Sequence, residues 1–479
     1  MADNGRISTA DLVVIGAGSA GLSVAAGAAQ LGLKVVLYEK GEMGGDCLNE
    51  GCVPSKALIA AAKAAQAHRT SARFGVAADE PAVDWPAVRQ HVRGVIEAIA
   101  PIDSQERFEG LGVRVVREAA RFADPRTVVS DTTRVRARRI VIATGSRPAV
   151  PATPGLDTVD YLTNETVFEL DALPARLIVL GAGPIGMELA QAFRRLGAAV
   201  TVVEAQTPLA RADPEAGQAV AAALTREGVE ILAGWSATAA ARTAAGVALT
   251  IEAEDGQRRT LEAERLLVAT GRRAALEGLD LAKGRIAHSA RGVTTDAGLR
   301  TSNPRVWALG DAAGREQFTH AAGQHASVWV RRALFRQSTR ADSLPIPEVT
   351  YTDPELAQIG LSEDAARRRF GARVRVTRWG FHDNDRAQAE RDTQGFAKLV
   401  LHANGQILGA TIVGAGAGEL LQIVTLAMSN GLRARALTNF VAPYPTRGEI
   451  VKRLAGAFYT PVLFSPGTRR LVGLLQRLP

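Results

Sequence analysis

The amino-acid sequence predicts an α/β protein that contains two Rossmann-like dinucleotide-binding domains. The main observation is that the glycine pattern G-x-G-x-x-G occurs twice, each time between an apolar segment and a helical segment. In each copy a second apolar segment follows and ends at a glutamate, about 20 residues after the glycines. The length of 479 residues, with 47% hydrophobic residues, is sufficient for two to four domains with sizeable cores.

The first glycine pattern follows the apolar run 11–15, which predicts a buried strand. Its glycines are Gly16, Gly18 and Gly21. A helical pattern comes next, and a second strand at 35–38 ends at Glu39. In such a unit the glycines allow a tight turn, the helix N-terminus faces a pyrophosphate, and the acidic side chain accepts hydrogen bonds from ribose hydroxyls. We therefore expect a dinucleotide site here.

The second glycine pattern follows the apolar run 176–180 and precedes a strand at 199–203. Its glycines are Gly181, Gly183 and Gly186. The strand ends at Glu204, whose carboxylate suits a free 2′-hydroxyl and repels a 2′-phosphate. No arginine follows until Arg211. The sequence therefore predicts NADH rather than NADPH at this second site.

The segment GGDCLNEGCVPSK, from Gly44 to Lys56, contains the only two cysteines of the chain, Cys47 and Cys52. Residues five apart on a regular helix lie about 7.5 Å apart along its axis, whereas a disulfide needs Cα atoms within about 4.4–6.8 Å. A disulfide would require a distorted first helical turn, which Gly51 and Pro54 would permit. Two unrelated buried thiols are the alternative. The neighbouring dinucleotide pattern favours a redox pair.

A third signal is TSNPRVWALGD at 301–311, an apolar strand that ends in a carboxylate. Asp311 would lie at the carboxyl end of a sheet, where it could hold a polyol such as a ribityl chain. Two segments, 143–148 and 269–272, each end a strand with a small-residue turn. They are typical of paired crossings between domains, although either one alone could be an ordinary strand end.

Together these motifs resemble those of the flavoprotein disulfide reductases, a family that includes dihydrolipoamide dehydrogenase, glutathione reductase and mercuric reductase. The resemblance covers nearly the whole chain. It implies that the first glycine pattern binds FAD, that the second binds NAD(P)H, and that Cys47 and Cys52 form a redox-active disulfide. It also implies a C-terminal α+β dimerisation domain, which opens with YTDPELAQIGLSE at 351–363.

The resemblance also implies a division of the chain into three domains. An FAD-binding domain is expected at 1–150 and 272–342, an NAD-binding domain at 151–271, and an interface domain at 343–479. Family members form homodimers in which each active site joins the disulfide face of one subunit to the last domain of the other. We therefore expect a homodimer with shared active sites.

Individual roles follow from the same resemblance. Cys47 would attack the substrate, Cys52 would contact the flavin, and Lys56 would lie near the flavin N5 with Glu188 as its ionic partner. The residues implied in FAD binding are Gly16, Gly18, Gly21, Glu39, Lys40, Gly45, Asp46, Thr144, Gly145, Asp311, Thr319 and His320. Those implied in NAD binding are Gly181, Gly183, Gly186, Glu204 and Gly271. Thr319 and His320 would begin a helix whose positive end stabilises charge on the reduced flavin.

One motif departs from the family pattern. Disulfide-reducing members carry His-Pro-Thr-x-x-Glu in the last domain, and this chain has Tyr444 in place of the histidine and retains Glu449. A phenol, with a pKa near 10, is a poor base at neutral pH. We therefore expect impaired dithiol oxidation. Mercuric reductases also place a tyrosine in this region, but they resemble one another in a C-terminal cysteine pair, and no cysteine follows Cys52 here.

The predicted function is electron transfer from NADH through FAD and the cysteine pair to a thiol or disulfide substrate, or the reverse. Tyr444 and Glu449 would act across the dimer. One alternative is direct reduction of a quinone or a metal ion by the flavin or the dithiol. A second alternative is a flavoprotein redox sensor or partner-binding subunit with negligible turnover.

The net charge of +8 does not indicate nucleic-acid binding, because the arginines are spread along the chain rather than gathered in a basic arm. Two cysteines are too few for a disulfide-stapled secreted protein, so a reducing cytoplasm is expected. Met1–Gly5 lacks the basic region of a signal peptide.

Two segments raise the question of membrane contact. Residues 399–418 are uncharged, but Asn404, Gly405 and Gln406 predict a hairpin turn rather than a membrane span. The segment 469–477 is amphipathic and basic. Packing at a subunit interface is the favoured interpretation of this segment, with contact at a membrane surface as the alternative.

Overall fold

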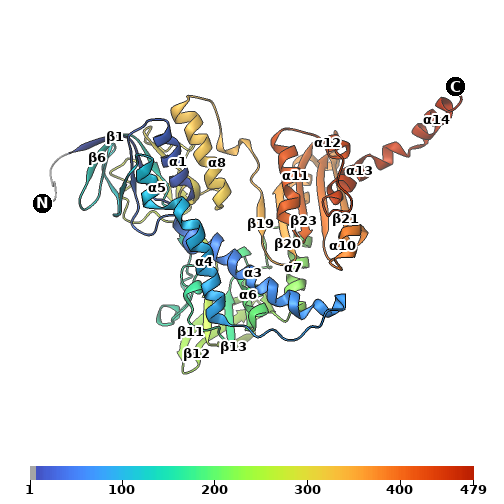
Figure 1. Ribbon diagram of the computed structural model, residues 1–479, viewed down its shortest axis with the longest axis horizontal. Helices are drawn as coiled ribbons and strands as arrows, with labels where there is room; N and C mark the ends of the chain where they lie inside the picture. Colours follow the sequence, from blue (N-terminus) through green and yellow to red (C-terminus); the bar gives the residue numbers. More distant parts are fainter. Residues whose placement is uncertain (1–6, 479) are drawn as a thin grey trace. The chain divides into compact units, whose positions relative to one another are not determined.

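The computed structural model describes residues 7–478, which form two compact units (Figure 1). The first unit contains the chain up to Ala205 together with Gly234–Ser343. The second contains Gln206–Ala233 and the chain from Leu344 onward. Met1–Gly5, on which the expected absence of a signal peptide rests, lies outside the described residues.

The largest sheet of the first unit has seven strands in the order β3-β2-β1-β6-β5-β4, with β18 beside β6. These strands are β1 (Ser8–Ile15), β2 (Val35–Tyr38), β3 (Arg114–Val116), β4 (Arg121–Asp124), β5 (Thr127–Val129), β6 (Arg134–Ile142) and β18 (Val306–Ala308). Alternate residues of β1 belong to two different cores, Leu12 and Val14 to one and Val13 and Ile15 to the other. Both faces of the sheet are therefore buried, which explains the uninterrupted apolar run in the sequence.

A second, smaller parallel sheet in the same unit repeats this arrangement. In it β8 (Arg176–Leu180) pairs in parallel with β9 (Ala199–Glu204) on one side and with β14 (Arg265–Val268) on the other. The remaining strands of the unit are β11 (Trp235–Thr243), β12 (Gly246–Ala253) and β13 (Arg258–Ala263), and the short pairs β7 (Ser146–Pro148) with β15 (Arg272–Ala274) and β16 (His288–Ser289) with β17 (Gly292–Val293). The pairing of β7 with β15 brings the two predicted crossing segments together.

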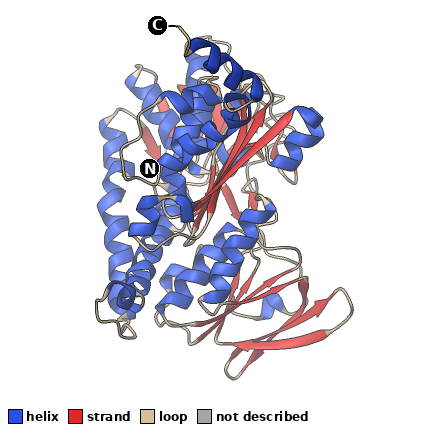
Figure 2. Cartoon of the chain, turned by 90° about the vertical axis from the view of Figure 1, so that its right-hand side faces the viewer, coloured by secondary structure: helices blue, strands red, loops and turns tan. Residues whose placement is uncertain are grey.

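Figure 2 shows the helices of the chain in blue and its strands in red. The helices of the first unit are α1 (Ser19–Gln30), α2 (Gly45–Asn49), α3 (Cys52–Arg69), α4 (Trp85–Asp103), α5 (Gln105–Gly110), α6 (Pro184–Leu196) and α8 (Thr319–Trp329). In this unit α1 packs beside β1 and β2, α6 packs beside β8 and β9, and α3 packs against α4 and α6. Helix α1 follows the first glycine pattern and α6 follows the second. Each glycine pattern therefore lies in a parallel strand, helix, strand unit, as the sequence predicted.

The second unit is built on an antiparallel sheet in the order β19-β20-β23-β22-β21. Its strands are β19 (Glu348–Thr350), β20 (Glu355–Gly360), β21 (Val374–Gly380), β22 (Phe396–His402) and β23 (Ile407–Gly414). Its other elements are α7 (Pro214–Arg226), β10 (Glu230–Ala233), α9 (Glu363–Phe370), α10 (Asp385–Ala389), α11 (Ala417–Ser429), α12 (Ala434–Asn439), α13 (Glu449–Leu463) and α14 (Pro466–Leu475). Helices α11 and α13 pack on this sheet and share its core.

The uncharged segment 399–418 is a hairpin in this sheet, because β22 and β23 pair on either side of the turn at Asn404 and Gly405. The prediction of a hairpin at this position is confirmed. Among residues 7–478, no helix is long and apolar enough to cross a membrane.

Candidate redox site

The two glycine loops have nearly the same backbone geometry. Gly16 has φ of 106°, and a Cβ atom there would lie 2.3 Å from the carbonyl oxygen of Ala143. Gly181 has φ of 108°, and a Cβ atom there would lie 2.5 Å from the carbonyl oxygen of Ala269. Only glycine can occupy both positions, since the φ angle and the close backbone exclude a side chain. Each loop is thereby held against a neighbouring strand end.

The acidic residue at the end of the second strand reaches back to its glycine loop in both copies. Glu39 accepts a hydrogen bond from the backbone N–H of Ala17 at 2.6 Å, and Glu204 accepts one from that of Ala182 at 2.8 Å. A Cβ atom on Gly183 would meet nothing within 4 Å. Both loops therefore hold a carboxylate in place, and the second loop also has open space at the start of its helix, as a dinucleotide requires.

The cysteine segment packs directly against the first glycine loop. The backbone N–H of Gly44 donates to the carbonyl oxygen of Ala17 at 3.0 Å. A Cβ atom on Gly45 would lie 2.7 Å from the Cα atom of Gly18. The two loops therefore touch backbone to backbone, and this contact holds the cysteines beside the predicted FAD site.

Cys47 and Cys52 lie on different helices rather than on one distorted turn. Cys47 is in α2, Cys52 is the first residue of α3, and the chain breaks between the helices at Glu50 and Gly51. A Cβ atom on Gly51 would lie 2.8 Å from a carboxylate oxygen of Asp46, so the tight break requires glycine. The break brings the two side chains together, and both cysteines are free thiols in this structure.

The pKa values of the two thiols are shifted in opposite directions. A hydrogen bond from Cys47 is the main cause that lowers the pKa of Cys52 to about 6, and Thr319 and Lys56 lower it further. The same hydrogen bond, together with partial burial, raises the pKa of Cys47 above its usual range. The position of Cys52 at the N-terminus of an 18-residue helix also favours a thiolate. The structure thus places the negative charge on Cys52 and the proton on Cys47.

Two further predicted residues contact this pair. Lys56, one turn along α3 from Cys52, lies 2.8 Å from the Glu188 carboxylate of α6. The Glu188 side chain is only 7% exposed, so the ion pair is shielded from solvent on its acidic side. Thr319, the first residue of α8, places its hydroxyl 3.4 Å from the sulfur of Cys52. His320 stacks on Phe318 with ring centroids 5.3 Å apart.

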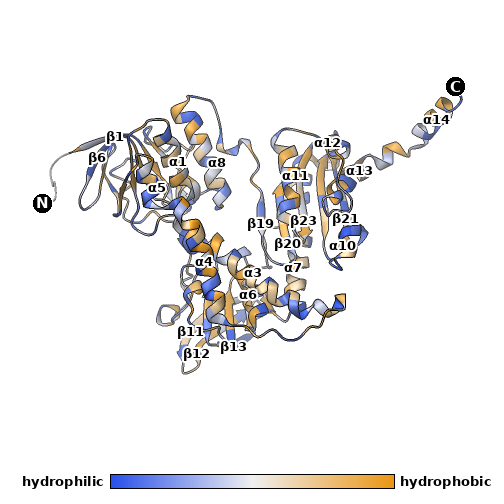
Figure 3. Ribbon diagram, in the orientation of Figure 1, coloured by the Kyte–Doolittle hydropathy of each residue, from blue (hydrophilic) through white to orange (hydrophobic). Residues whose placement is uncertain are grey.

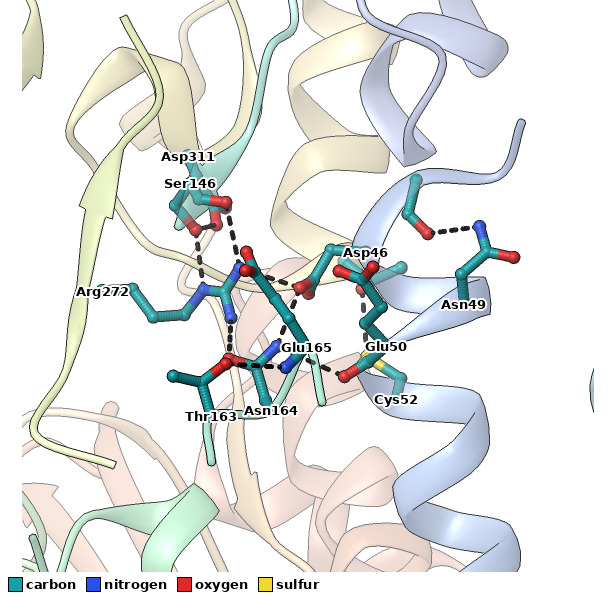
Figure 4. Close-up of polar contacts among 12 residues, drawn as sticks. Asp46, Asn49, Glu50, Cys52, Ser146, Thr163, Asn164, Glu165, Arg272 and Asp311 are labelled. Carbon is teal, nitrogen blue, oxygen red and sulfur yellow. Dashed lines mark hydrogen bonds and ion pairs between the residues drawn. The ribbon is translucent and has the colours of Figure 1, made fainter. Parts of the chain in front are cut away.

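A polar network centred on Arg272 connects the cysteine segment to the predicted ribityl motif (Figure 4). The guanidinium of Arg272 donates to the Ser146 hydroxyl at 2.7 Å and to the Asp46 carboxylate at 3.0 Å. The Ser146 hydroxyl in turn donates to Asp311 at 2.5 Å. Burial raises the pKa of Asp311, and the Ser146 hydroxyl opposes this effect.

Asn164 extends the same network to the break between the helices. Its side-chain amide donates to Asp46 at 3.0 Å and to the backbone oxygen of Glu50 at 3.2 Å, and its carbonyl accepts from Arg272 at 3.1 Å. Sequence reasoning missed Arg272, Ser146 and Asn164. The one available signal was the position of Arg272, which directly follows the small-residue turn 269–271 at the end of a buried strand.

These features fit an FAD molecule. The first glycine loop approaches the neighbouring strand end so closely that no side chain fits between them. Glu39 and Asp311 supply acceptors for hydroxyl groups. The hydroxyl of Thr144, in the turn after β6, is buried and has no hydrogen-bond partner within the described part of the chain. A bound polar group could satisfy this hydroxyl, since buried polar atoms are normally paired. Lys40, also expected at this site, has an exposed side chain.

His325, on α8, is a buried neutral histidine next to this site. Its Nδ1 accepts a hydrogen bond from the backbone N–H of Gly310 at 3.1 Å, and its ring is completely buried. Burial lowers the pKa of His325 to about 4. The unfolded chain therefore binds a proton below about pH 6.5, which the folded chain takes up only near pH 4.

We expect this histidine to weaken the fold in acid. Between about pH 6.5 and pH 4 the stability of the wild type should fall by roughly 3 kcal/mol from this group alone. The His325→Asn variant keeps an acceptor for Gly310 but does not titrate, so its unfolding midpoint should depend less on pH. His68→Asn, at an exposed position on α3, is the matched control. Equal pH slopes for the wild type and His325→Asn in urea unfolding would contradict the assignment.

The remaining predicted residues, Tyr444 and Glu449, lie in the second unit. Tyr444 is 72% exposed, and its hydroxyl donates to the Asp385 carboxylate at 3.0 Å. This hydrogen bond is the main cause that raises the pKa of Tyr444 above its usual value. Glu449 is the first residue of α13. The phenol therefore stays protonated at neutral pH.

Comparison with known proteins identifies the class to which this fold and site belong. Residues 10–326 match the family described as pyridine nucleotide-disulphide oxidoreductase, and residues 346–455 match its dimerisation domain. The chain belongs to this family of FAD-dependent oxidoreductases, which use a pyridine nucleotide. The predictions of the fold class, of the family and of FAD with a pyridine nucleotide as cofactors are thereby confirmed.

Several relatives match almost the whole chain. It is 36% identical to a mercuric reductase of Streptomyces lividans, over 94% of this chain and 97% of the relative. It is 36% identical to dihydrolipoyl dehydrogenase 3 of Pseudomonas aeruginosa, over 93% of this chain and 97% of the relative. The HOCl-induced flavoprotein disulfide reductase RclA from Escherichia coli is similar in structure, with a TM-score of 0.83 and 26% identity over 93% of this chain and 99% of that one.

Proposed function

We propose that this flavoenzyme uses NADH to reduce a disulfide substrate, or runs in reverse on a dithiol, through Cys47 and Cys52. The observation that carries the proposal is the polarised thiol pair beside the first glycine loop. Cys52 has a pKa lowered to about 6 and Cys47 retains its proton. In such a pair Cys52 can keep a stable thiolate beside the first glycine loop, while Cys47 can attack a substrate disulfide once it gives up its proton.

The residues would act in a fixed order. Bound FAD supplies the two-electron link between a nicotinamide and the cysteine pair, and the glycine loops, Glu39 and Glu204 would hold the two dinucleotides. In the reduced pair, the Cys47 sulfur attacks one sulfur of the substrate disulfide and the Cys47 proton passes to the other sulfur, which leaves as the first thiol. The Cys52 thiolate then attacks the Cys47 sulfur, restores the internal disulfide and expels the second substrate sulfur as a thiolate, which takes a proton from water. Lys56, paired with Glu188, keeps a positive charge near the Cys52 thiolate.

The proposal also includes the division of the chain and its assembly. Residues 1–150 and 272–342 are assigned to FAD and residues 151–271 to NADH. The matched dimerisation domain supports a homodimer, in which Tyr444 and Glu449 of one subunit would serve the cysteines of the other. A cytoplasmic location suits a cysteine pair that must cycle between thiol and disulfide.

Reduction of a metal ion is the second candidate. The observation that favours it is Tyr444, whose protonated hydroxyl leaves the site without the base that dithiol chemistry needs. A reduced cysteine pair is also a good ligand for soft metal ions. The similarity to mercuric reductases and to RclA of Escherichia coli, whose structure is known as a Cu(II) complex, agrees with this second candidate.

A panel of electron acceptors tests the proposal. Steady-state oxidation of NADH should be measured with lipoamide, low-molecular-weight disulfides, quinones, and mercuric and cupric ions. Turnover with a disulfide that is abolished in Cys47→Ser supports the main proposal, and turnover only with metal ions supports the second candidate. Turnover with quinones that survives in Cys47→Ser would identify direct flavin chemistry. Negligible turnover with every acceptor would favour a redox sensor or a partner-binding subunit.

The choice of nucleotide gives a separate prediction. The Glu204 carboxylate is held at the second glycine loop by Ala182, where it would face the 2′ position of the ribose. We expect kcat/KM for NADH to exceed that for NADPH by at least about tenfold, which corresponds to about 1.4 kcal/mol. The Glu204→Gln variant should narrow this ratio, whereas Glu254→Gln, at an exposed position after β12, should leave it unchanged. Equal use of both nucleotides by the wild type would contradict the prediction.

A further inference from the structure

Helix α14 is an exposed amphipathic helix at the end of the described residues. None of its ten residues is buried, and every residue from Arg469 to Leu478 is exposed. Figure 3 shows hydrophobic and hydrophilic residues side by side on this helix. Helix α14 contributes no residue to the hydrophobic core of the second unit, whose last residues belong to α13. The matched dimerisation domain ends at residue 455, before α14 begins.

The three leucines of α14 share one face, and Val472 lies beside that face. Leu471, Leu474 and Leu475 are spaced three and four apart, so they lie on the same side of the helix. Leu478 continues this side after the helix ends, and all four side chains are more than half exposed. The last two residues of α13 and the residue that follows them add three more exposed apolar side chains. They are Val462, Leu463 and Phe464.

The charges around this face all have the same sign. Arg469 and Arg470 lie outside the leucine face of the helix, Arg477 follows the helix, and no acidic residue occurs between Glu449 and the end of the sequence. A second copy of α14 would bring three more arginines against these three without a carboxylate to pair with them. A surface that is apolar inside and negative at its boundary complements both features of the helix.

We propose that α14 binds the surface of an anionic phospholipid bilayer, with the leucine face in the acyl boundary and the arginines at the headgroups. With ten residues the helix is far too short to span a bilayer, which takes about 20 residues. It lies in the interfacial plane instead. The sequence alone favoured packing at a subunit interface, and the full exposure of the helix together with its uniform charge favours the bilayer.

The test uses the full-length, FAD-loaded protein and sedimentation with lipid vesicles. Binding is expected to vesicles of phosphatidylglycerol mixed with phosphatidylcholine and to be much weaker with pure phosphatidylcholine. Binding should also weaken as salt is raised, because the arginine contribution is screened. The double variants Leu474→Ser/Leu475→Ser and Arg469→Gln/Arg470→Gln should each weaken binding to the mixed vesicles by about tenfold or more.

Matched controls come from other exposed positions. Val76 is 60% exposed, as Leu474 is, so Val76→Ser removes a comparable apolar group elsewhere. Arg368→Gln/Arg369→Gln removes two exposed charges on α9. Both controls should bind vesicles as the wild type does, and flavin absorbance and the unfolding midpoint should be unchanged in all variants.

Two results would overturn the proposal. One is equal or absent binding to mixed and neutral vesicles. The other is a change of molar mass by light scattering in the leucine variant without any vesicle binding, which would show that α14 covers a second copy of the chain. Because neither readout depends on turnover, they distinguish failure of this proposal from failure of the proposed redox function.

Discussion

Disulfide reduction is expected to disappear in the Cys47→Ser variant, with a loss of at least about a thousandfold, because the attacking thiolate is removed and Cys52 cannot replace it. NADH oxidation with ferricyanide, which can take electrons from the flavin without the cysteines, is the control and should remain. Retention of this activity shows that the variant is folded and loaded with FAD. Disulfide turnover close to that of the wild type would contradict the role of Cys47.

The same pair predicts the electron capacity of the protein. Titration with dithionite should consume about four electrons per FAD, two for the flavin and two for a Cys47–Cys52 disulfide. A long-wavelength charge-transfer band from the Cys52 thiolate to the flavin should be present at the halfway point. Cys52→Ser should abolish this band. Uptake of only two electrons by the fully oxidised wild type would rule out the redox pair.

The pH dependence of that band follows from the thiol pKa. Since the pKa of Cys52 is lowered to about 6, the thiolate and the band should persist at neutral pH and be lost as the pH falls below about 6. Thr319→Val removes a hydroxyl that lowers this pKa. In that variant the loss of the band should begin at higher pH. A band that is independent of pH from pH 8 to about pH 5 would contradict the assignment of the thiolate.

The second large effect is expected from Tyr444→His. Dihydrolipoamide oxidation by the wild type should be slow at neutral pH and should rise with pH, because the substrate thiols and Cys47 must ionise without help. The pKa of Cys47 is raised and the phenol of Tyr444 stays protonated, so neither group accepts a proton at pH 7. Since a positioned base contributes about 10²–10⁴-fold, Tyr444→His should raise the neutral rate by a factor in this range. Glu449 is already present to orient the ring.

Tyr444→Phe is the matched control for this experiment. It keeps the ring but removes the hydroxyl and its hydrogen bond to Asp385. If the phenol takes no part in proton transfer, the rate of this variant at pH 7 should equal that of the wild type. Fast wild-type turnover with a plateau near pH 6–7 would contradict the argument. Such a result would mean that a group other than Tyr444 transfers the proton.

Much of the fold could be predicted from short stretches of sequence. The steric demands of a glycine loop, its flanking strands and its closing acidic residue all lie within one local unit of the chain. Gly16 approaches Ala143 as closely as Gly181 approaches Ala269, so the same steric demand requires glycine in both copies of the pattern. The hairpin at Asn404 was predictable for the same reason, because it depends on neighbouring residues. The start of α8 at Thr319 was expected from the family resemblance.

The sequence predicted the break in the helix at the cysteines only in part. The sequence indicated that Gly51 distorts a helical turn, whereas the structure ends one helix and begins another there. The close approach of Gly51 to Asp46 is the physical reason. Asp46 is itself held by Arg272, which lies 226 residues further along the chain. No local pattern contains this contact.

By itself, the sequence determined the two dinucleotide units, the thiol pair and the loss of the usual histidine, because these depend on residue type and short spacing. Only the tertiary structure decided which thiol holds the proton, since the partners of Cys52 include Thr319, which is 267 residues away. It also decided that His325 is buried and that α14 is exposed. The burial of a side chain and its hydrogen-bond partners depend on distant parts of the chain. They determine the pKa values of the reacting groups and which surfaces are exposed for binding.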